Sequence, residues 1–426
     1  MEHKKVVYVF AFIVVATILL IFIKPKDEGK PYSPYFVALN EELKKNSTGT
    51  PVLVIDLDLL DKNIDTLKHF IQAPKSYRVV DKSLPSLGLI EYIFQKTGTK
   101  KVMCFHQPFL NLWAKQKPDV DLLLGKPMPI DAVATFYNNL PDSSTFNPAK
   151  QIQWLIDSEA RLKQYQVFAQ QNNLQLQLNV EIDVGLHRGG LNDTAQLKSL
   201  LRVIEKDAAH LSFTGFMGYD AHIPEVFPPL GTQDAVLKKA QEIYASFIHS
   251  GRQNFPHFFT KKLCFNGAGS KTYQLYEKDT LLNDVSAGSG LLKPTDFDIP
   301  NLENHQPAFF IATPVLKKSS GIKIPFLEFL SPLMEWWNPN LSTTYFIYGG
   351  RWKAKHYEPR GLRANALYGF SSNQEIVNGS NKTNLKVDDY IFLRPTQSEA
   401  VMLEFGDIVL LRNGKLSGKW HVFAVQ

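Results

Sequence analysis

Residues 78–86 read RVVDKSLPS. A short run typical of a β-strand ends at Lys82, and the turn after it starts the next helix. In a parallel α/β barrel, reactive side chains stand where the strands end. A lysine that is partly removed from water loses its proton at modest cost and forms a Schiff base with an aldehyde cofactor. Taken alone, Lys82 is more often an ordinary surface lysine, so the rest of the chain has to decide between these interpretations.

Eight strand-like runs follow one another, and each is followed by a stretch long enough for a helix. This alternation is typical of an α/β fold of the (β/α)8 or TIM-barrel type. An open doubly wound sheet is the alternative, but no dinucleotide-type glycine fingerprint follows the first strand. The predicted strands are 78–83, 101–106, 120–124, 151–157, 175–183, 212–219, 262–266 and 283–287, and helices are predicted at 87–97, 132–139, 159–171, 194–206 and 232–249.

The pattern changes on both sides of this barrel. Before it, residues 31–50 are predicted to be a tether with one short helix, and residues 52–57 form an apolar strand. After about residue 304 the strand-like runs are separated by turn signals such as Asn413-Gly414, which indicates a mostly β C-terminal domain. The predicted domains are therefore 51–303 for the barrel and 304–426 for the β domain, with strands at 307–318, 344–348, 389–393, 407–412 and 419–425.

The length and composition of the chain limit the classes of protein to which it can belong. A chain of 426 residues is too long for one compact core, which favours two domains. The net charge of +6 is spread along the chain without a basic stripe, so a nucleic-acid partner is not expected. Cys104 and Cys264 are the only cysteines, which excludes a disulfide framework and a metal site with three thiolates.

The amino terminus carries a strongly apolar run. Residues 6–23 are 18 residues without a charge, which is long enough for a transmembrane helix. No small-residue cleavage site follows, so we expect an uncleaved membrane anchor within residues 1–30. Lysines flank the run on both sides, and the side of the membrane that holds the folded domains therefore stays open.

Polar residues and glycines gather where the predicted strands end. Glycine-rich ends at the seventh and eighth strands suit a phosphate, because bare backbone N–H groups can approach its oxygens. A phosphate site together with a strand-end lysine suits pyridoxal phosphate. Arg188 is a fixed positive charge for the ring oxygen or a substrate carboxylate, and Tyr219 and His222 are candidate proton donors or acceptors.

Each of these residues has a structural alternative. Glycines at strand ends are more often turn formers, histidines are often structural, and Arg188 alone fits a surface ion pair. Their convergence on one face of one barrel favours the functional interpretation.

Several stretches resemble one known family. TPVLVIDLD at 50–58 is similar to the opening of the fold-type III pyridoxal phosphate enzymes, the group of alanine racemase. VEIDVGLHRGG at 180–190, GFMGYDAH at 215–222 and DVSAGSG at 284–290 resemble more closely the D-threonine aldolase and D-serine dehydratase branch. The resemblance extends from about residue 50 to the end, and it implies a β-rich C-terminal domain and a head-to-tail homodimer.

The resemblance also implies roles for individual residues. Lys82 would bind the cofactor covalently and act as a base, Arg188 would lie by the cofactor ring, and Tyr219 and His222 would line the substrate side. The residues that it implies for cofactor binding after the late strands are Asn266, Gly267, Gly269, Ser270, Gly288 and Ser289.

The chain departs from this branch at the family's metal site. The branch carries a divalent metal on a Pro-x-His-x-Cys or His-x-Asp element, and the matching residues 394–399 read RPTQSE. Gln397 replaces the histidine and Glu399 the cysteine or aspartate, which is a weak ligand set for zinc. The metal requirement stays open, and Glu399 is alternatively an acid/base group or a partner of the substrate ammonium.

We therefore expect a membrane-anchored pyridoxal phosphate enzyme that acts on a D-amino acid or D-β-hydroxy-amino acid as an aldolase- or dehydratase-type lyase. An amino acid racemase is the alternative enzyme. A non-catalytic cofactor carrier is the alternative from another class, and the long second domain argues against it. The substrate and its stereochemistry stay open.

Overall fold

The structure is a computed structural model that describes Tyr8 and residues 23–141 and 143–424. The predicted anchor at residues 6–23 lies outside this part of the chain except for Tyr8 and Ile23. Among the residues described, no helix combines the length and apolar character needed to span a bilayer. By its internal contacts the chain divides into two compact units.

The larger unit, which holds residues 55–309, is built on a closed barrel of eight strands. All neighbouring strands in the barrel are parallel, and each overlaps one predicted strand, so the predicted barrel is confirmed. The strands are β2 (Ser76–Val80), β3 (Lys101–Cys104), β4 (Asp121–Leu124), β5 (Ile152–Ile156), β6 (Leu176–Glu181), β7 (Leu211–Gly218), β8 (Cys264–Gly267) and β9 (Asp284–Ala287).

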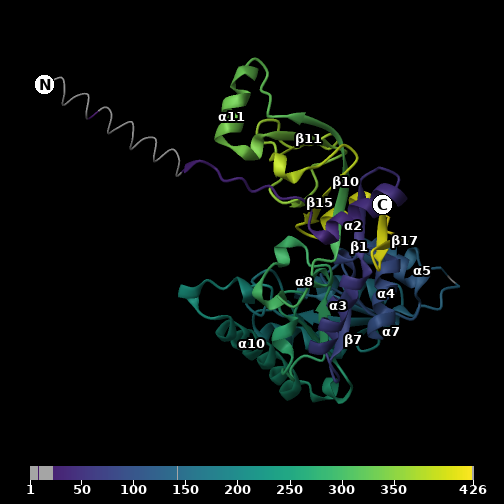
Figure 1. The fold of residues 1–426 in the computed structure, drawn as a ribbon. Coiled ribbons are helices and arrows are strands. Elements are labelled where there is room, and N and C mark those ends of the chain that lie inside the picture. Colours follow the sequence, from purple (N-terminus) through teal and green to yellow (C-terminus); the bar gives the residue numbers. More distant parts are fainter. Residues whose placement is uncertain (1–7, 9–22, 142, 425–426) are drawn as a thin grey trace. The chain divides into compact units, whose positions relative to one another are not determined.

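Amphipathic helices cover this barrel (Figure 1). In α9 (Thr194–Lys206) the Asp193 side chain accepts a hydrogen bond from the Ala195 N–H, which caps the first turn. Leu197, Leu200, Leu201 and Ile204 recur at helical spacing and are buried, and α9 contacts β7. The other barrel helices are α3 (Leu57–Phe70), α4 (Leu87–Thr97), α5 (Gln107–Gln116), α6 (Ile130–Asn138), α7 (Pro148–Gln151), α8 (Glu159–Gln171) and α10 (Gln233–Asn254).

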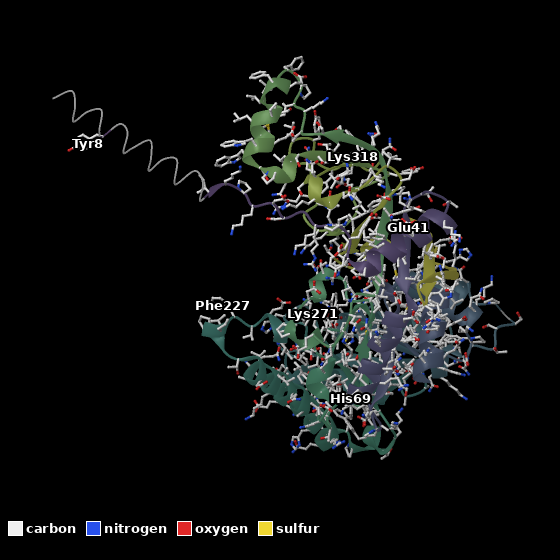
Figure 2. The ribbon with its side chains drawn as sticks, in the orientation of Figure 1. Tyr8, Glu41, His69, Phe227, Lys271 and Lys318 are labelled. Carbon is white, nitrogen blue, oxygen red and sulfur yellow. The ribbon has the colours of Figure 1, made fainter. Side chains whose placement is uncertain are left out.

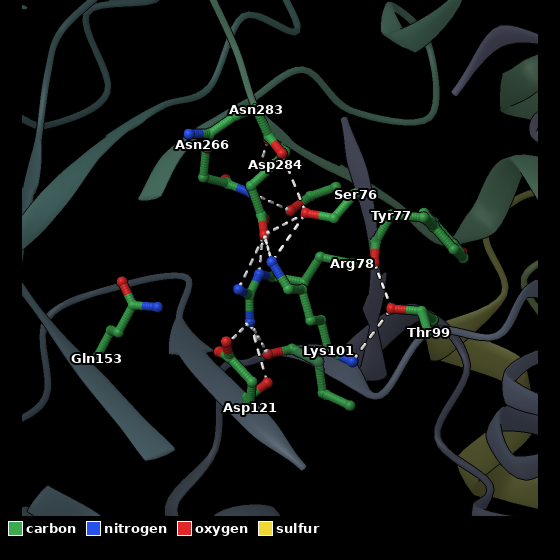
Figure 3. A network of polar contacts seen from close by, with 12 residues as sticks. Ser76, Tyr77, Arg78, Thr99, Lys101, Asp121, Gln153, Asn266, Asn283 and Asp284 are labelled. Carbon is green, nitrogen blue, oxygen red and sulfur yellow. Dashed lines mark hydrogen bonds and ion pairs between the residues drawn. The ribbon is translucent and has the colours of Figure 1, made fainter. Parts of the chain in front are cut away.

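An ion network centred on the fully buried Arg78 joins strands β2, β3, β4 and β9 (Figure 3). The Arg78 side chain is fully buried, and its Nε donates to Asp284 Oδ1 at 2.7 Å. Its Nη1 donates to Asp121 Oδ1 at 2.9 Å, and Lys101 Nζ donates to Asp284 Oδ2 at 2.9 Å. Burial opposes ionisation of Asp284, but Arg78 and Lys101 outweigh it and hold the pKa of this carboxyl far below its usual range.

Pairing of the first and last strands closes the barrel. β2 runs parallel to β9, with Ser76 opposite Asp284 and Val79 opposite Ala287. The chain that leaves β2 therefore emerges beside the chain that leaves β9. Lys82 follows the first of these strand ends and Gly288 the second, so closure brings these two predicted site residues to neighbouring positions.

The smaller unit is mostly β, as predicted for the second domain. The chain also forms a nine-stranded sheet with the order β13-β14-β11-β10-β1-β16-β17, in which β15 pairs with both β10 and β12. Of these strands, β1, β16 and β17 lie only partly within the smaller unit. The sequence did not predict β12, β13 and β14, which are short. The strands are β1 (Val52–Asp56), β10 (Phe309–Ser320), β11 (Thr343–Ile347), β12 (Ala354–Glu358), β13 (Arg363–Ala364), β14 (Ile376–Gly379), β15 (Tyr390–Pro395), β16 (Asp407–Arg412) and β17 (Lys415–His421).

The units differ in outline from the predicted domains. Helix α2 (Pro34–Asn46), within the predicted tether, buries Phe36, Leu39 and Leu43 in the apolar core of the smaller unit. Residues 396–410, which contain α12 (Glu399–Phe405), cluster with the barrel unit, although the predicted boundary at 304 assigns them to the β domain. A single cut in the sequence does not describe this arrangement, because the chain re-enters the barrel unit after β15.

Candidate active site

A cavity of about 400 Å³ opens at the carboxyl ends of the barrel strands. Its lining comes from turns after several different strands, and every lining residue belongs to the barrel unit. Its volume falls within the range of sites that enclose small ligands. Of the predicted site residues, those that line it are Lys82, Arg188, Tyr219, Asn266, Gly269, Ser270, Gly288, Ser289, Gln397 and Glu399.

Lys82 lies in a single 3₁₀ turn (Asp81–Ser83) directly after β2. Its Nζ stands 4.6 Å from the centre of the Phe105 ring, which follows β3. Burial lowers the pKa of the Lys82 amine, and the positive charge of Arg188 acts in the same direction, whereas the Glu399 carboxylate raises it. The net shift is downward, so more of the amine is neutral, and able to act as a nucleophile or base, than for an exposed lysine.

Asp81, in the same turn as Lys82, attaches this turn to helix α5. This carboxyl is fully buried, and Trp113 Nε1 on α5 donates to its Oδ2 at 3.0 Å. Burial raises the pKa of Asp81 to about 7. Its contact with the indole fixes the direction in which the chain leaves β2, and with it the position of the next residue, Lys82.

The turns after β8 and β9 meet beside this lysine. Ser270 Oγ accepts a hydrogen bond from the Gly288 N–H at 2.9 Å. A Cβ atom at Gly288 would lie 3.0 Å from the Cβ atoms of both Ser83 and Val80, so only glycine fits without displacing them. Ser289 Oγ lies 3.1 Å from Ser398 Oγ. The result is a compact cradle of backbone and hydroxyl groups that suits the phosphate of pyridoxal phosphate.

Arg188 and Tyr219 form a stacked pair on the cavity wall. The Arg188 guanidinium lies 4.7 Å from the centre of the Tyr219 ring. A Cβ atom at Gly269 would lie 2.7 Å from Cε2 of the same ring, so this glycine allows the tyrosine its position. Burial raises the pKa of Tyr219 despite the opposing charge of Arg188, so the phenol is protonated at neutral pH. The pair offers an anion a fixed cation and a hydroxyl donor.

Three predicted residues lie differently from the rest. His222 is not among the cavity-lining residues, and its Nε2 lies 3.1 Å from the point that a Cβ at Gly185 would occupy. Gly267 lies within β8 and faces Leu282. Asn266 lines the cavity, but its amide donates to Asp284 Oδ1 at 2.7 Å and to Ser286 Oγ at 2.8 Å. A substrate-side role for His222 stays a prediction.

Other lining residues were not predicted from the sequence. Lys271 Nζ pairs with Glu225 Oε1 at 2.7 Å and stands 5.7 Å from the Phe297 ring, which gives the cavity wall a charged pair (Figure 2 labels Lys271). Phe105 contributes the ring beneath Lys82. None of these residues belongs to a motif. Phe105 directly follows β3 and Lys271 lies a few residues beyond β8, so their positions could have signalled them, whereas Glu225 and Phe297 lie too far beyond a strand end for such a signal.

The residues at the family's metal position do not fit a metal centre. Gln397 and Glu399 both line the cavity, and they offer one amide and one carboxylate. Within residues 23–141 and 143–424, no group of three or more His, Cys, Asp or Glu side chains is placed to hold a metal ion. Zinc sites in proteins use three or four such ligands. Glu399 instead acts electrostatically on Lys82 and Tyr219.

Comparison with known proteins agrees with this architecture. The family model of the alanine racemase N-terminal domain matches residues 55–295. No protein in a curated set matches the chain by sequence.

Solved structures are similar over most of their length. A D-threonine aldolase from Filomicrobium marinum has 14% identity and a TM-score of 0.66, with 88% of this chain and 96% of that chain covered. D-threo-3-hydroxyaspartate dehydratase from Delftia sp. HT23 has 15% identity and a TM-score of 0.67, with 90% of this chain and 100% of that chain covered. Alanine racemase from Bacillus anthracis, with bound L-Ala-P, has 12% identity and a TM-score of 0.64, with 87% of this chain and 97% of that chain covered. At such low identities these likenesses establish the fold alone.

Proposed function

The chain belongs to the alanine racemase N-terminal domain family, within the fold-type III pyridoxal phosphate enzymes, and from this premise we propose that it uses pyridoxal phosphate to act on a free amino acid of the D-series. One observation carries the proposal. Lys82, the guanidinium of Arg188 and the cradle at Ser270, Gly288 and Ser289 line a single cavity. Pyridoxal phosphate needs an amine that reacts with its aldehyde and a site that binds its phosphate, and this cavity contains both.

Bound pyridoxal phosphate supplies an electron-withdrawing ring that stabilises negative charge at the α-carbon of an amino acid. The residues of this chain then orient and move protons. Lys82, with its lowered pKa, holds or removes a proton at the α-carbon. Tyr219, protonated at neutral pH, donates a hydrogen bond or a proton from the cavity wall. Glu399 offers a carboxylate to the substrate ammonium.

We propose lyase chemistry of the aldolase or dehydratase type on a D-β-hydroxy-amino acid as the first activity. The motifs at 180–190, 215–222 and 284–290 support it by their resemblance to that branch. Racemisation is the second candidate, and a specific observation favours it. The ligand set at Gln397 and Glu399 does not fit the metal that the lyases use to assist loss of the β-substituent, whereas proton transfer by Lys82 and Tyr219 needs no metal.

The cofactor assignment is tested by borohydride reduction. The purified chain is expected to show the visible absorption of bound pyridoxal phosphate, and reduction should fix the label on the peptide that contains Lys82. Lys82→Ala should abolish the label, whereas Lys126→Ala, a change at a neighbouring exposed lysine, should keep it. A label on any other lysine would overturn the assignment.

The reaction is tested by incubation with D-threonine, D-serine and L-alanine in deuterated buffer, with and without manganese. Release of an aldehyde or keto acid identifies the lyase. Solvent deuterium at the α-carbon together with formation of the enantiomer identifies the racemase. A chain that binds the cofactor and turns over none of these amino acids would be a cofactor carrier.

We further propose that residues 6–23 anchor the chain in a membrane and that the active form is a homodimer. The anchor is supported by the length and apolar character of this run. The dimer is supported by the family resemblance. Flotation with lipid vesicles tests the anchor, and light scattering in detergent tests the dimer.

A further inference from the structure

The smaller unit carries an exposed surface of large apolar side chains on residues 322–337 and 366–370, which we call the aromatic surface. Phe326 is 93% exposed, Phe329 75% and Trp336 65%. Leu367, Tyr368 and Phe370 are also exposed. Helix α11 (Ser331–Trp337) carries Trp336 (Figure 1). Large exposed apolar side chains gathered on two neighbouring segments are typical of protein–protein or membrane interaction sites.

The two segments form one surface. The Tyr368 hydroxyl donates to the Lys323 carbonyl oxygen at 3.1 Å. Ile324 and Met334 from the first segment and Leu367 from the second line the same groove, with a volume of about 440 Å³. The two segments that carry the exposed aromatic side chains therefore pack against each other.

Folding gains little from these exposed side chains. Phe326 has a φ of 70°, in the left-handed region that a bulky side chain rarely adopts. Backbone in this region is strained for a phenylalanine. The turn therefore exposes the Phe326 side chain to water, and this side chain adds no buried apolar area to the unit. A partner that receives the side chain accounts for this arrangement.

The residues that directly follow the amino-terminal apolar run contact this surface. Lys24 follows the run directly, and its Nζ lies 4.6 Å from the centre of the Trp336 ring. Asn340, just beyond α11, donates through its amide to the Lys26 carbonyl oxygen at 2.7 Å and accepts from the Glu28 N–H at 2.9 Å. The chain that leaves residues 6–23 is thus attached at the aromatic surface.

Charges around the surface fit an anionic lipid headgroup region. Lys24, Lys26 and Lys323 stand at its border. The acidic side chains that follow Lys26 are paired, Asp27 with Lys382 and Glu28 with Arg363. Of the two acidic residues in 322–337, Glu328 accepts from the Phe326 N–H at 3.2 Å, and Glu335 lies against Gly321. Lysines beside phenylalanine and tryptophan are the residues that proteins place at the boundary between headgroups and acyl chains.

We infer that the aromatic surface is a second membrane contact, which seats Phe326, Phe329 and Trp336 in the headgroup region of the bilayer beside the amino-terminal run. The inference rests on the anchor proposed above. It adds a site within the folded unit, so that the chain is held to the bilayer at two points rather than by a free tether.

The test uses the full chain reconstituted into vesicles of phosphatidylcholine and phosphatidylglycerol, with or without brominated acyl chains. An environment-sensitive fluorophore is attached at Phe329→Cys and, as the matched control, at Val167→Cys on exposed α8. The unsubstituted chain corrects for labelling of Cys104 and Cys264. We expect the label at 329 to lose roughly half its fluorescence in brominated vesicles, and the label at 167 to keep its fluorescence.

A second measurement avoids the cysteine variants. Brominated lipids should quench part of the intrinsic tryptophan fluorescence, and Trp336→Phe should remove most of that quenched part. Trp420→Phe in the barrel unit should leave it unchanged. The same quenching in both variants would overturn the inference.

Other outcomes overturn the inference in distinguishable ways. If the chain floats with vesicles while the label at 329 stays unquenched, the anchor is supported and the second membrane contact is contradicted. A blue-shifted label that bromine does not quench and that reverts on dilution shows a second copy of the chain on this surface. A chain that does not float removes both membrane proposals, while cofactor absorption in the same sample reports separately on the enzyme proposal.

Discussion

Lys82 carries most of the proposed chemistry, and the groups around it decide how readily its amine loses a proton. Burial and Arg188 lower its pKa, and Glu399 works against them. Glu399 therefore limits the neutral fraction of the amine while it offers the cavity a negative charge. By the resemblance noted in the sequence, Glu399 stands at a metal-ligand position of the related lyases, and we propose that its carboxylate acts here on the lysine and the substrate.

Glu399→Gln tests this electrostatic role. Removal of the negative charge should lower the pKa of Lys82 further, because the opposing influence of Glu399 is lost. The amine then becomes neutral at lower pH, so the rising limb of the rate of cofactor uptake by the apoprotein should move to lower pH. The uptake rate is followed by absorbance across a pH series.

The matched control is Glu225→Gln, because Glu225 also lines the cavity but pairs with Lys271 and is not among the leading influences on Lys82. This variant should leave the pH profile in place. A shift of the Glu399→Gln profile to higher pH would contradict the assigned sign.

At the scale of elements, the cofactor cradle depends on two turns that hold each other. Ser270→Ala removes the acceptor of the Gly288 N–H and leaves that donor without its protein partner. Loss of such a bond costs about 1–3 kcal/mol. We expect the affinity for pyridoxal phosphate to fall about tenfold, which corresponds to about 1.4 kcal/mol. Titration of the apoprotein measures it.

Ser246→Ala on α10 makes the same chemical change at an exposed serine that bonds only within its helix. It should leave the cofactor affinity unchanged. Equal affinities for the Ser270→Ala variant and the unsubstituted chain would show that the cradle does not need this bond.

The strands also carry the buried ion network that closes the barrel. Asp284→Asn leaves Arg78 buried without its main charge partner, and loss of one partner of a buried pair costs about 3–5 kcal/mol. The pKa of Asp284 is lowered by folding, so its stabilising contribution is present at neutral pH and is lost only as the pH falls below about 4. Denaturant unfolding at neutral pH should show the loss.

Glu159→Gln serves as the control for this prediction, because it breaks an exposed pair with Lys163 on α8. Such pairs contribute at most about 1 kcal/mol. A loss of stability for Asp284→Asn no greater than for Glu159→Gln would contradict the importance assigned to the network.

At the scale of the whole molecule, deletion of residues 1–22 should change the chain from one that resists extraction from membranes by alkaline carbonate to one that alkaline carbonate extracts. The apolar run supplies the proposed anchor, and the described residues that line the cavity all lie between Val80 and Glu399. Bound cofactor, measured by absorbance, should be retained. Full-length chain that is extracted by alkaline carbonate would contradict an anchor that spans the bilayer.

The sequence by itself determined the barrel, because alternating apolar runs and amphipathic helices are local patterns that burial on both sides of a parallel strand imposes. It also determined most of the cavity lining, since residues that follow parallel strands meet at one end of the barrel. Lys82, Arg188, Ser270 and Gly288 come together for this reason.

Only the tertiary structure decided which residues from distant parts of the chain lie together around the cavity. Glu225 meets Lys271, Phe105 packs under Lys82, and residues 396–410 rejoin the barrel unit, although no local pattern announces these contacts. The aromatic surface is the same kind of result. Whether Phe326 and Trp336 are buried or exposed depends on which elements pack around them, and a stretch of sequence does not specify its neighbours in space.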